Sequence, residues 1–465
     1  MNKNPISMDR NKGTKKAHLK PISARLFVLV APALVFALTV SAASIKEEVL
    51  REAQSQYAEL ESLYYHLHAN PELSFHEEQT AKRLVSTLSP LGFDITENVG
   101  GHGFVAVLKN GPGPVLLIRA DLDALPVTEE TGLPYASQVR TLNDDGSDVG
   151  VMHACGHDIH MTVFIGTAQQ LAKLKNQWSG TLIMIGQPAE EKGAGARAML
   201  EDGLFQRFPL PDYCIALHVN AGMPAGTVGY VPGYALANVE SVDITMRGVG
   251  GHGAWPHATK DPIVLAAQTI MALQTIVSRE IPPTEAAVVT VGSIHGGTKH
   301  NIIPNEVKLQ LTLRSYTDEV RKKTITSIER IVQGMALAAG VPEDKLPSVT
   351  RSDQFTPSTY NDPELALRLA KVFQEALGEN RVEQTEPVMG GEDFGRYGRT
   401  EHKLPICIFW LGSVDPSILE TAAKKGETPP SLHSSRYHPQ PEPTITTGVS
   451  AMTLAALELL GPKTD

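Results

Sequence analysis

Two patterns of apolar and polar positions alternate along the chain, and the first predicts a buried sheet. Short apolar runs, which are typical of strands covered on both faces, are separated by amphipathic runs that are typical of helices. The apolar runs lie at 114–127, 181–191, 214–219 and 404–412, and the amphipathic runs lie at 45–68, 363–378 and 446–460, with a further helix expected after residue 158. We therefore predict an α/β fold whose mostly parallel sheet is covered by helices on both faces.

The second pattern occupies residues 235–348. Apolar and polar residues alternate there at 239–254, 288–297 and 305–318, as in strands with one exposed face, and amphipathic helices are predicted at 262–280 and 318–340. A chain of 465 residues is too long for one core, so we expect two domains. The larger would comprise residues 44–234 and 349–465, and the smaller α+β domain, at 235–348, would be inserted into it.

The first 43 residues are typical of a secretory signal. Seven Lys and Arg residues and a single acid, Asp9, precede an uncharged run at 26–43 that ends in small residues. We expect cleavage near Ala43 and a secreted or periplasmic protein. The alternative is an uncleaved membrane anchor through 26–43, because an apolar run of this length is at the short limit for a membrane span.

The net charge limits the kinds of partner that the chain can bind, and the cysteine content limits the disulfides that it can form. Without its N-terminal segment the chain has 34 Lys and Arg residues against 50 Asp and Glu, a net charge near −16, which argues against nucleic acid or anionic lipid as partner. Three cysteines in so long a chain do not make a disulfide framework. Cys214 and Cys407 lie in apolar runs and are expected to be buried thiols rather than a disulfide, whereas Cys155 has polar neighbours.

Polar side chains follow the predicted buried strands, or precede a predicted helix, at several separate places. These residues are Asp121, Asp123, Cys155, His157, Glu190, Glu191, His218 and His433. In open parallel sheets the loops beyond the carboxyl ends of the strands converge on one crevice, where ligands bind. We therefore expect these side chains to meet at one edge of the sheet. The polar segment 137–150 is a candidate substrate-facing loop.

Thiolate, imidazole and carboxylate together favour zinc or a similar divalent ion. The spacing of Cys155 and His157 is a weak indication by itself, and a lone histidine is more often structural than ligating, so the convergence carries the inference. Glu190 and Glu191 leave a strand in different directions. One can therefore bind metal while the other takes a proton from the activated water and returns it to a leaving amine. The alternative for this pair is a solvated surface turn.

Seven motifs, in one order, resemble those of the M20 metallopeptidases. Within that family the chain is most similar to the amidohydrolase branch, which includes hippurate hydrolases, indole-acetyl-amino-acid hydrolases and N-acyl-amino-acid deacylases. The motifs are LHANPELSFHEEQTA (67–81), RADLDALPV (119–127), MHACGHD (152–158), QPAEE (187–191), GVGGHGAWPHATKDPI (248–263), HNIIPNEV (300–307) and GGEDF (390–394).

The resemblance implies a dinuclear metal site with a defined set of ligands. Cys155 would bridge the two metal ions, and Glu190 would be the general base and acid. The remaining ligands would be His157, Glu191, His218 and His433. Two divalent ions per subunit are implied, with zinc favoured by the cysteine and manganese, cobalt or nickel as alternatives.

The resemblance also implies that the inserted domain is a lid and dimerisation domain, so that a homodimer is expected. His252 would reach a neighbouring active site and help to polarise the scissile carbonyl. Asn301 and Arg314 would grip a substrate carboxylate or the developing oxyanion. The alternative for Asn301 and Arg314 is an ordinary structural role.

One departure from the family pattern favours the amidohydrolase branch. The peptidase branches carry a ligating histidine in H-x-D, whereas Asp121 and Asp123 form D-L-D here; these acids would instead orient ligating histidines as hydrogen-bond acceptors. We expect hydrolysis of a small N-acyl amino acid to a carboxylic acid and a free amino acid. The alternatives are a secreted M20-type dipeptidase or carboxypeptidase and a catalytically silent metal- or ligand-binding protein, which would have no need of Glu190.

Overall fold

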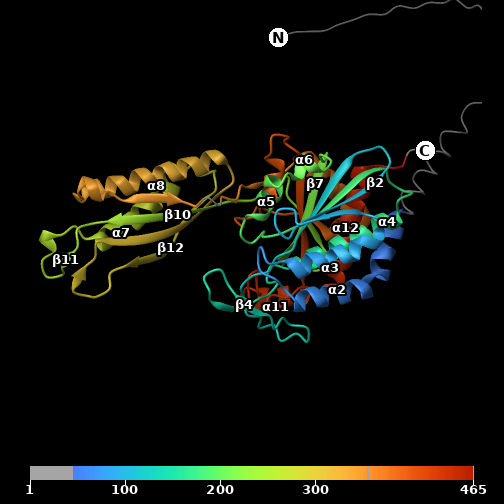
Figure 1. Cartoon of the computed structure of the whole chain (residues 1–465), viewed down its shortest axis with the longest axis horizontal. Coiled ribbons are helices and arrows are strands. Elements are labelled where there is room, and N and C mark those ends of the chain that lie inside the picture. Colours follow the sequence, from blue (N-terminus) through green and yellow to red (C-terminus); the bar gives the residue numbers. More distant parts are fainter. Residues whose placement is uncertain (1–44, 353–354, 464–465) are drawn as a thin grey trace, which may run out of the picture. The chain divides into compact units, whose positions relative to one another are not determined.

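The computed structural model describes residues 45–352 and 355–463 (Figure 1). The predicted signal or anchor segment, residues 1–43, lies outside the described residues.

The larger sheet has eight strands in the order β1-β2-β6-β3-β7-β18-β8-β17. Its strands are β1 (Asp94–Glu97), β2 (Phe104–Asn110), β3 (Val115–Asp121), β6 (Gly180–Gln187), β7 (Tyr213–Pro224), β8 (Val228–Tyr230), β17 (Val382–Gln384) and β18 (Ile406–Val414). The four central strands β6, β3, β7 and β18 run parallel, whereas β2 is antiparallel to β6 and β8 is antiparallel to β18. The predicted mostly parallel α/β sheet is confirmed.

Helices bury both faces of this sheet. On one side α4 (His157–Lys173) and α12 (Pro441–Leu460) contact each other and β3. On the other side α5 (Gly195–Glu201) and α6 (Leu204–Arg207) contribute Met199 and Phe205 to a core that contains Leu117. Because successive strand residues point to opposite faces, the apolar run in β3 supplies both cores.

Five further helices of the larger unit are α2 (Tyr57–Ala69), α3 (Glu78–Leu88), α9 (Pro363–Leu377), α10 (Gly395–Gly398) and α11 (Pro416–Lys425).

The helix α12 is a core helix. Among the helices that the structure describes, α12 has the length and apolar composition of a membrane span, but 78% of the relevant window is buried inside the protein. The helix also packs against α9 and β18, which is the arrangement of a core helix.

A separate four-stranded antiparallel sheet lies between Asn238 and Arg351, in the order β12-β14-β10-β15. Its strands are β10 (Asn238–Arg247), β12 (Ala287–Gly296), β14 (Glu306–Ser315) and β15 (Ser348–Arg351). Helices α7 (Pro262–Thr275) and α8 (Asp318–Ala338) pack on it over a core of their own. We call this part the four-stranded unit; its folding as an independent domain, with boundaries at 235 and 348, stays a prediction.

The structure interrupts two predicted elements. The helix expected at 45–68 is broken by a turn at Gln56, and the strand expected at 239–254 ends at Arg247. At Gly248 an added Cβ would lie 2.1 Å from the carbonyl oxygen of Lys260, so only glycine allows this close approach. The chain then forms the two-residue strand β11 (Gly251–His252), which pairs with β13 (Ile302–Ile303).

The two strand cysteines are free, as expected. Cys214 pairs with Ile406 and Cys407 pairs with Ile215 on the neighbouring parallel strand. Since paired residues share a face and successive residues alternate, the two thiols point to opposite faces of the sheet. A disulfide between them is therefore ruled out by the register.

Candidate metal centre

The register of the central strands brings the predicted ligands to one level. Asp121, the last residue of β3, pairs with Gln187, the last residue of β6. Arg119 pairs with Ala216 on β7, so Asp121 and His218, each two residues further on, also lie side by side. The chain beyond β6 carries the glutamate pair, and the sheet edge thus collects side chains from three strands.

The start of α4 depends on a glycine. Gly156 has a φ of 76°, and an added Cβ would lie 2.6 Å from the Val219 side chain. A side chain at this position would be strained and would collide with β7. Gly156 therefore allows Cys155 and His157, on either side of it, to approach the strand that carries His218.

Hydrogen bonds fix which nitrogen of each histidine faces the site. Nδ1 of His157 donates to the main-chain oxygen of Asp123 at 2.8 Å, and Nδ1 of His218 donates to the main-chain oxygen of Val219 at 2.8 Å. Nε2 of His218 lies 3.6 Å from Cys155 Sγ, and Nε2 of His157 is buried without a hydrogen-bond partner among the described residues. A buried polar atom without a partner is costly, and a metal ion at Nε2 would remove that cost.

Three groups of donor atoms lie close enough to share a metal ion. They are Cys155 with His157 and His218, Cys155 with Glu191 and His433, and His157 with Glu190 and Glu191, and within each group the donor atoms lie within 4.8 Å of one another. Cys155 belongs to two of the groups, which suits a bridging position. Oε1 of Glu191 is buried without a partner in the part of the chain that the structure describes, and its Oε2 lies 3.5 Å from His433 Nε2.

The electrostatics of the site also fit a cation. Burial, together with Glu191 and Glu190, raises the pKa of Cys155 well above its usual range, and burial raises the pKa of Glu191 to about 7. Burial lowers the pKa of His157, but Asp121 and Asp123 outweigh it and raise the pKa to about 10. Divalent metal reverses these preferences, because its charge favours thiolate and carboxylate and displaces a proton from a ligating imidazole.

A fourth group, Asp121 with His157 and His160, is not equivalent to the others. Nδ1 of His160 lies 2.7 Å from Asp121 Oδ1, and its Nε2 accepts the N–H of Val219 at 2.9 Å. Both ring nitrogens are therefore occupied, so His160 holds Asp121 rather than a metal. The sequence motifs did not single out His160, although its position three residues after His157 places it on the same face of α4.

The predicted supporting acids lie on either side of the candidate ligand His157: Asp121 Oδ2 is 3.5 Å from its Nε2, and Asp123 Oδ1 is 3.5 Å from its Nδ1. Asp121 accepts a hydrogen bond from Arg119 Nη1 at 2.6 Å. Oδ2 of Asp123 accepts from Ser74 Oγ at 2.6 Å and from the main-chain N–H of Glu191 at 3.0 Å. Asp123 holds His157 mainly through its main-chain carbonyl, a contact that residue type alone does not indicate.

Glu190 is buried beside a network of charged side chains that the sequence pattern did not indicate. Burial, and after it the neighbouring Glu392 and Glu191, raises the pKa of Glu190 well above its usual range. Glu392 and Asp393 of the GGEDF motif are ion-paired to Arg119, with Nη2 at 2.6 Å and 3.4 Å from their oxygens. Their grouping with Glu190 is therefore a salt-bridge cluster, because Arg119 already supplies the positive charge. A lone Arg in the apolar run of β3 is the signal that could have revealed it.

Arg314 faces the same cavity as the metal donors. A cavity of about 280 Å³ is lined by Cys155, Glu190, Glu191, His218, His433 and Arg314, among others. Arg314 is half-buried, and burial lowers the pKa of its guanidinium. Within residues 45–352 and 355–463 the structure gives the guanidinium of Arg314 no ion-pair or hydrogen-bond partner. An unpaired guanidinium at a cavity is suited to a carboxylate ligand.

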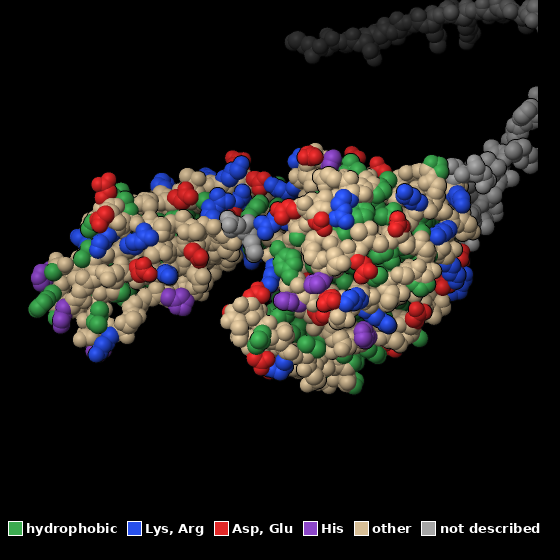
Figure 2. Space-filling model, viewed as in Figure 1, with side chains coloured by type: hydrophobic (Ala, Val, Ile, Leu, Met, Phe, Trp, Pro, Cys, Tyr) green, Lys and Arg blue, Asp and Glu red, His purple; other side chains and the backbone are tan. Residues whose placement is uncertain are grey.

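His252 and Asn301 lie together, but not at this cavity. The main-chain N–H of Gly253 donates to the Asn301 oxygen at 2.9 Å, and the His252 ring lies 5.2 Å from that of Trp255. Both residues are exposed, and neither lines the cavity. Hydrophobic and histidine side chains gather over the end of the four-stranded unit where β11 lies (Figures 1 and 2). The structure therefore separates them from the metal donors of their own chain.

The segment 137–150, a candidate substrate-facing loop, contains a β-hairpin. Strands β4 (Arg140–Leu142) and β5 (Asp148–Gly150) pair in it. Asp144 in its turn lies 2.6 Å from Lys192 Nζ, and Lys192 lines the cavity. The hairpin thus reaches the edge of the candidate site.

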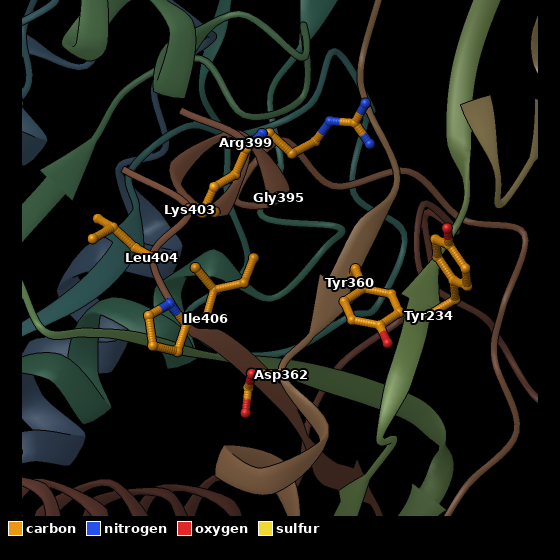
Figure 3. Close-up of a pocket in the computed structure, with 10 residues that line it drawn as sticks. Tyr234, Tyr360, Asp362, Gly395, Arg399, Lys403, Leu404 and Ile406 are labelled. Carbon is orange, nitrogen blue, oxygen red and sulfur yellow. The ribbon is translucent and has the colours of Figure 1, made fainter. Parts of the chain in front are cut away.

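A larger cavity, of about 390 Å³, lies beside β9 (Gly233–Leu236) and β16 (Thr359–Asn361) (Figure 3). Figure 3 shows Tyr234 and Tyr360 on one side of it and Arg399 on another. Its carboxylate, Asp362, accepts the N–H of Leu365 and caps α9, and Arg399 is ion-paired with Asp318. The lining residues form no group of metal donors.

Comparison with known proteins agrees with this geometry. The model of the peptidase family M20/M25/M40 matches residues 117–428. The thermostable carboxypeptidase 2 of Saccharolobus solfataricus is 36% identical over 375 residues, which cover 80% of this chain and 88% of that protein. The hippurate hydrolase of Campylobacter jejuni is 38% identical over 342 residues, which cover 72% and 84%. The structure of the Bacillus subtilis YXEP protein, described as a dinuclear metal binding peptidase, has a TM-score of 0.70 and 29% identity and covers 87% and 99%.

Proposed function

Because the chain belongs to the peptidase family M20/M25/M40, we propose that this hydrolase cleaves the amide bond that joins an acyl group to an amino acid. The products are a carboxylic acid and a free amino acid. One observation carries the proposal. His157 and Glu191 have buried donor atoms without hydrogen-bond partners among the described residues, and both lie close to Cys155. The cavity there is lined by Cys155 and Glu191 together with the buried carboxylate of Glu190 and the unpaired guanidinium of Arg314.

Two divalent metal ions would be held by Cys155, His157, Glu191, His218 and His433. The donor set of thiolate, imidazole and carboxylate favours zinc, with manganese, cobalt or nickel as alternatives. When bound, such ions supply Lewis acidity to the attacking water and to the scissile carbonyl. Asp123 would orient His157 through its main-chain oxygen, and Asp121, which His160 holds in place, would support His157 from beside its Nε2.

Glu190 moves the proton in this proposal. Its carboxylate is buried, and Oε2 lies 3.9 Å from His157 Nε2, on the side of the metal donors. From there it takes a proton from the attacking water and returns it to the leaving nitrogen as the C–N bond breaks. Glu392 is ion-paired with Arg119 and is therefore committed elsewhere, which leaves Glu190 as the base.

Arg314 would hold the α-carboxylate of the amino-acid half. Its free guanidinium lines the same cavity as Glu190, so a substrate anchored there presents its amide to the metal donors. A peptidase that requires a free amino group would need an uncommitted acid for that group. The lining acids are Glu190, Glu191 and Glu392, and each has another role, which favours a blocked acyl group.

A second copy of the chain would supply His252. His252 and Asn301 are exposed and lie away from the cavity of their own chain. The four-stranded unit has β12 as an edge strand, and α7 exposes Val264 and Met271 at 53% and 71%. An open strand edge and exposed apolar side chains are features of interfaces, which supports a homodimer formed through this unit.

A carboxypeptidase is the second candidate, because the carboxypeptidase relative is about as similar as the hippurate hydrolase. Release of amino acid should be measured from N-acetyl, N-benzoyl, indole-acetyl and longer N-acyl amino acids beside unblocked dipeptides, with added metal and with chelator. Chelator-sensitive cleavage of blocked substrates is expected. N-benzoylglycinamide, which lacks the carboxylate, is the matched control and should be a poor substrate. Cleavage of dipeptides alone would assign the chain to the peptidases.

A further inference from the structure

One short segment between α2 and α3 contacts two loops of the candidate site, the one that carries Glu190 and Glu191 and the one that carries the supporting acid Asp123. Oε1 of Glu77 accepts the main-chain N–H of Phe75 and that of Ala189, each at 2.8 Å. Ser74 donates to Asp123 Oδ2 at 2.6 Å. The main-chain N–H of Ala124 donates to the oxygen of Glu72 at 2.8 Å. Glu77 is completely buried, so these contacts are shielded from water.

Both residues that donate to Glu77 are in the left-handed conformation. The φ angle is 67° at Phe75 and 49° at Ala189. Residues with a Cβ rarely adopt this conformation, and they keep it only where their surroundings impose it. The shared acceptor on Glu77 is such a surrounding, because relaxation of either residue would leave a buried N–H without a partner.

Ala189 immediately precedes the glutamate pair. The turn there sends Glu191 toward Cys155 and His433, whereas Glu190 lies between His157 and the pair formed by Glu392 and Asp393. The main-chain oxygen of Ala189 also accepts the N–H groups of Ala194 and Gly195, at 3.2 Å and 3.1 Å. The conformation of Ala189 therefore determines where both carboxylates point.

We propose that Glu77 is a positioning residue, whose carboxylate holds Ala189 in the left-handed conformation and thereby sets the directions of Glu190 and Glu191. The inference rests on the proposed function only for the roles of those two glutamates. The constraint on Ala189 can be tested without any substrate.

Two conservative variants distinguish the effect of the side-chain length of Glu77 from the effect of its charge. Glu77→Gln keeps the side-chain length and an oxygen acceptor, whereas Glu77→Asp keeps the charge but is one methylene shorter. Hydrogen exchange of the peptide 187–193 should be measured in metal-free protein. We expect Gln to leave its exchange within about threefold of the parent and Asp to accelerate it about tenfold or more, since local opening controls exchange.

Metal affinity is the second readout, followed by kcat and KM. Glu77→Asp should weaken binding of Zn²⁺ or Mn²⁺ by about 10–100-fold and lower kcat with little change in KM, because the supporting partners of ligands act on this scale. Glu77→Gln should retain both properties. Asn361→Ala is the matched control: its buried amide bonds Val231 and Ile408 away from the cavity, so it should lose stability without changing exchange at 187–193.

Parent-like exchange and metal affinity in Glu77→Asp would overturn the proposal. So would a Glu77→Gln variant that is as impaired as Glu77→Asp, since charge rather than reach would then matter. If even the parent hydrolyses no N-acyl amino acid, the proposed function fails, whereas exchange and metal affinity still decide the role of Glu77.

Discussion

The edge of the larger sheet and the β11–β13 end of the four-stranded unit carry predicted site residues in opposite circumstances. At the sheet edge, His157 and His218 are buried, and each is oriented by a hydrogen bond from Nδ1 to a main-chain oxygen. At β11–β13, His252 is exposed, and its Nδ1 accepts only the nearby N–H of Ala254, at 3.0 Å. The first group is arranged before any ligand binds, whereas His252 and Asn301 are not among the described residues that line the cavity of the metal donors.

This difference separates two kinds of contribution to catalysis. Residues at the sheet edge should control metal binding and proton transfer within one chain. Residues at β11–β13 should affect turnover only when they meet a substrate bound to another copy, and their loss should leave metal binding intact. Variants in the two regions should therefore differ in which property they change.

The largest effect is expected at Glu190. Glu190→Gln removes the proton acceptor but keeps the size of the side chain, so kcat should fall by up to ~10⁴-fold. Metal content, measured by elemental analysis, should stay at the parent level. Glu364→Gln, at an exposed position on α9, is the control. Turnover at the parent rate in Glu190→Gln would show that another group moves the proton.

The second prediction is that the side chain of Cys155 controls the affinity for metal ions. Cys155→Ala should weaken metal binding by more than about 100-fold, because loss of a ligand exceeds the cost of losing a supporting partner. Competition with a chromogenic chelator measures this change. Cys214→Ala is the matched control, since that thiol is buried in the apolar core and should alter stability only. Equal metal affinity in the two variants would exclude a ligand role for Cys155.

At β11–β13, His252→Ala should lower kcat/KM by about 100-fold, the usual effect of one lost donor to a developing oxyanion. Metal affinity should not change. A loss of metal together with activity would contradict the separation between the two regions.

Mixing inactive variants sharpens this test. If His252 acts on the partner's site, co-expressed Glu190→Gln and His252→Ala chains form mixed dimers with one intact site, and about a quarter of the parent activity should return. A mixture no more active than the separate variants would place His252 in its own chain's site or outside catalysis.

The smallest effect is expected at His68, which is ion-paired with Asp158 at the start of α4, next to the candidate metal donors. His68 on α2 lies 2.6 Å from Asp158 and 3.1 Å from Glu129, and all three are buried. Burial lowers the pKa of His68, but these acids outweigh it and raise the pKa to about 9, from 6.5. Because the folded state binds this proton more tightly, the stabilisation is complete below pH 6.5 and is lost as pH rises through about 9.

The expected loss in the free energy of unfolding over that range is ~3 kcal/mol. Urea unfolding of metal-free protein at a series of pH values measures it. His68→Gln cannot titrate and should flatten this part of the profile. An equally steep profile in His68→Gln would assign the dependence to other groups.

The sequence indicated which side chains gather at the sheet edge, because their types and their places after apolar strands carry the signal. Their role as metal ligands stays a prediction. It could not predict the contacts behind them. Arg119 meets Glu392, and Glu77 meets Ala189, only because the fold brings distant segments together. Neither the strand register nor the left-handed conformation of an alanine is encoded in a local pattern.

The location of His252 in the four-stranded unit is a second feature that could not be predicted from the sequence. The alternating pattern predicted the strands of the four-stranded unit, but β10 ends at Arg247, and the glycine-rich segment after it forms the separate short strand β11, which carries His252. The resemblance of the sequence motifs predicts a role for His252, whereas its separation from the donors of its own chain depends on the packing of the whole unit.

The most direct test is to titrate metal-free protein with Zn²⁺ or Mn²⁺ while following both bound metal and hydrolysis of an N-acyl amino acid. Activity should be absent at first, rise with occupancy and level off at about two ions per chain, and Cys155→Ala should show neither change. Full activity in protein that holds less than ~0.1 ion per chain would contradict metal-dependent hydrolysis at this site.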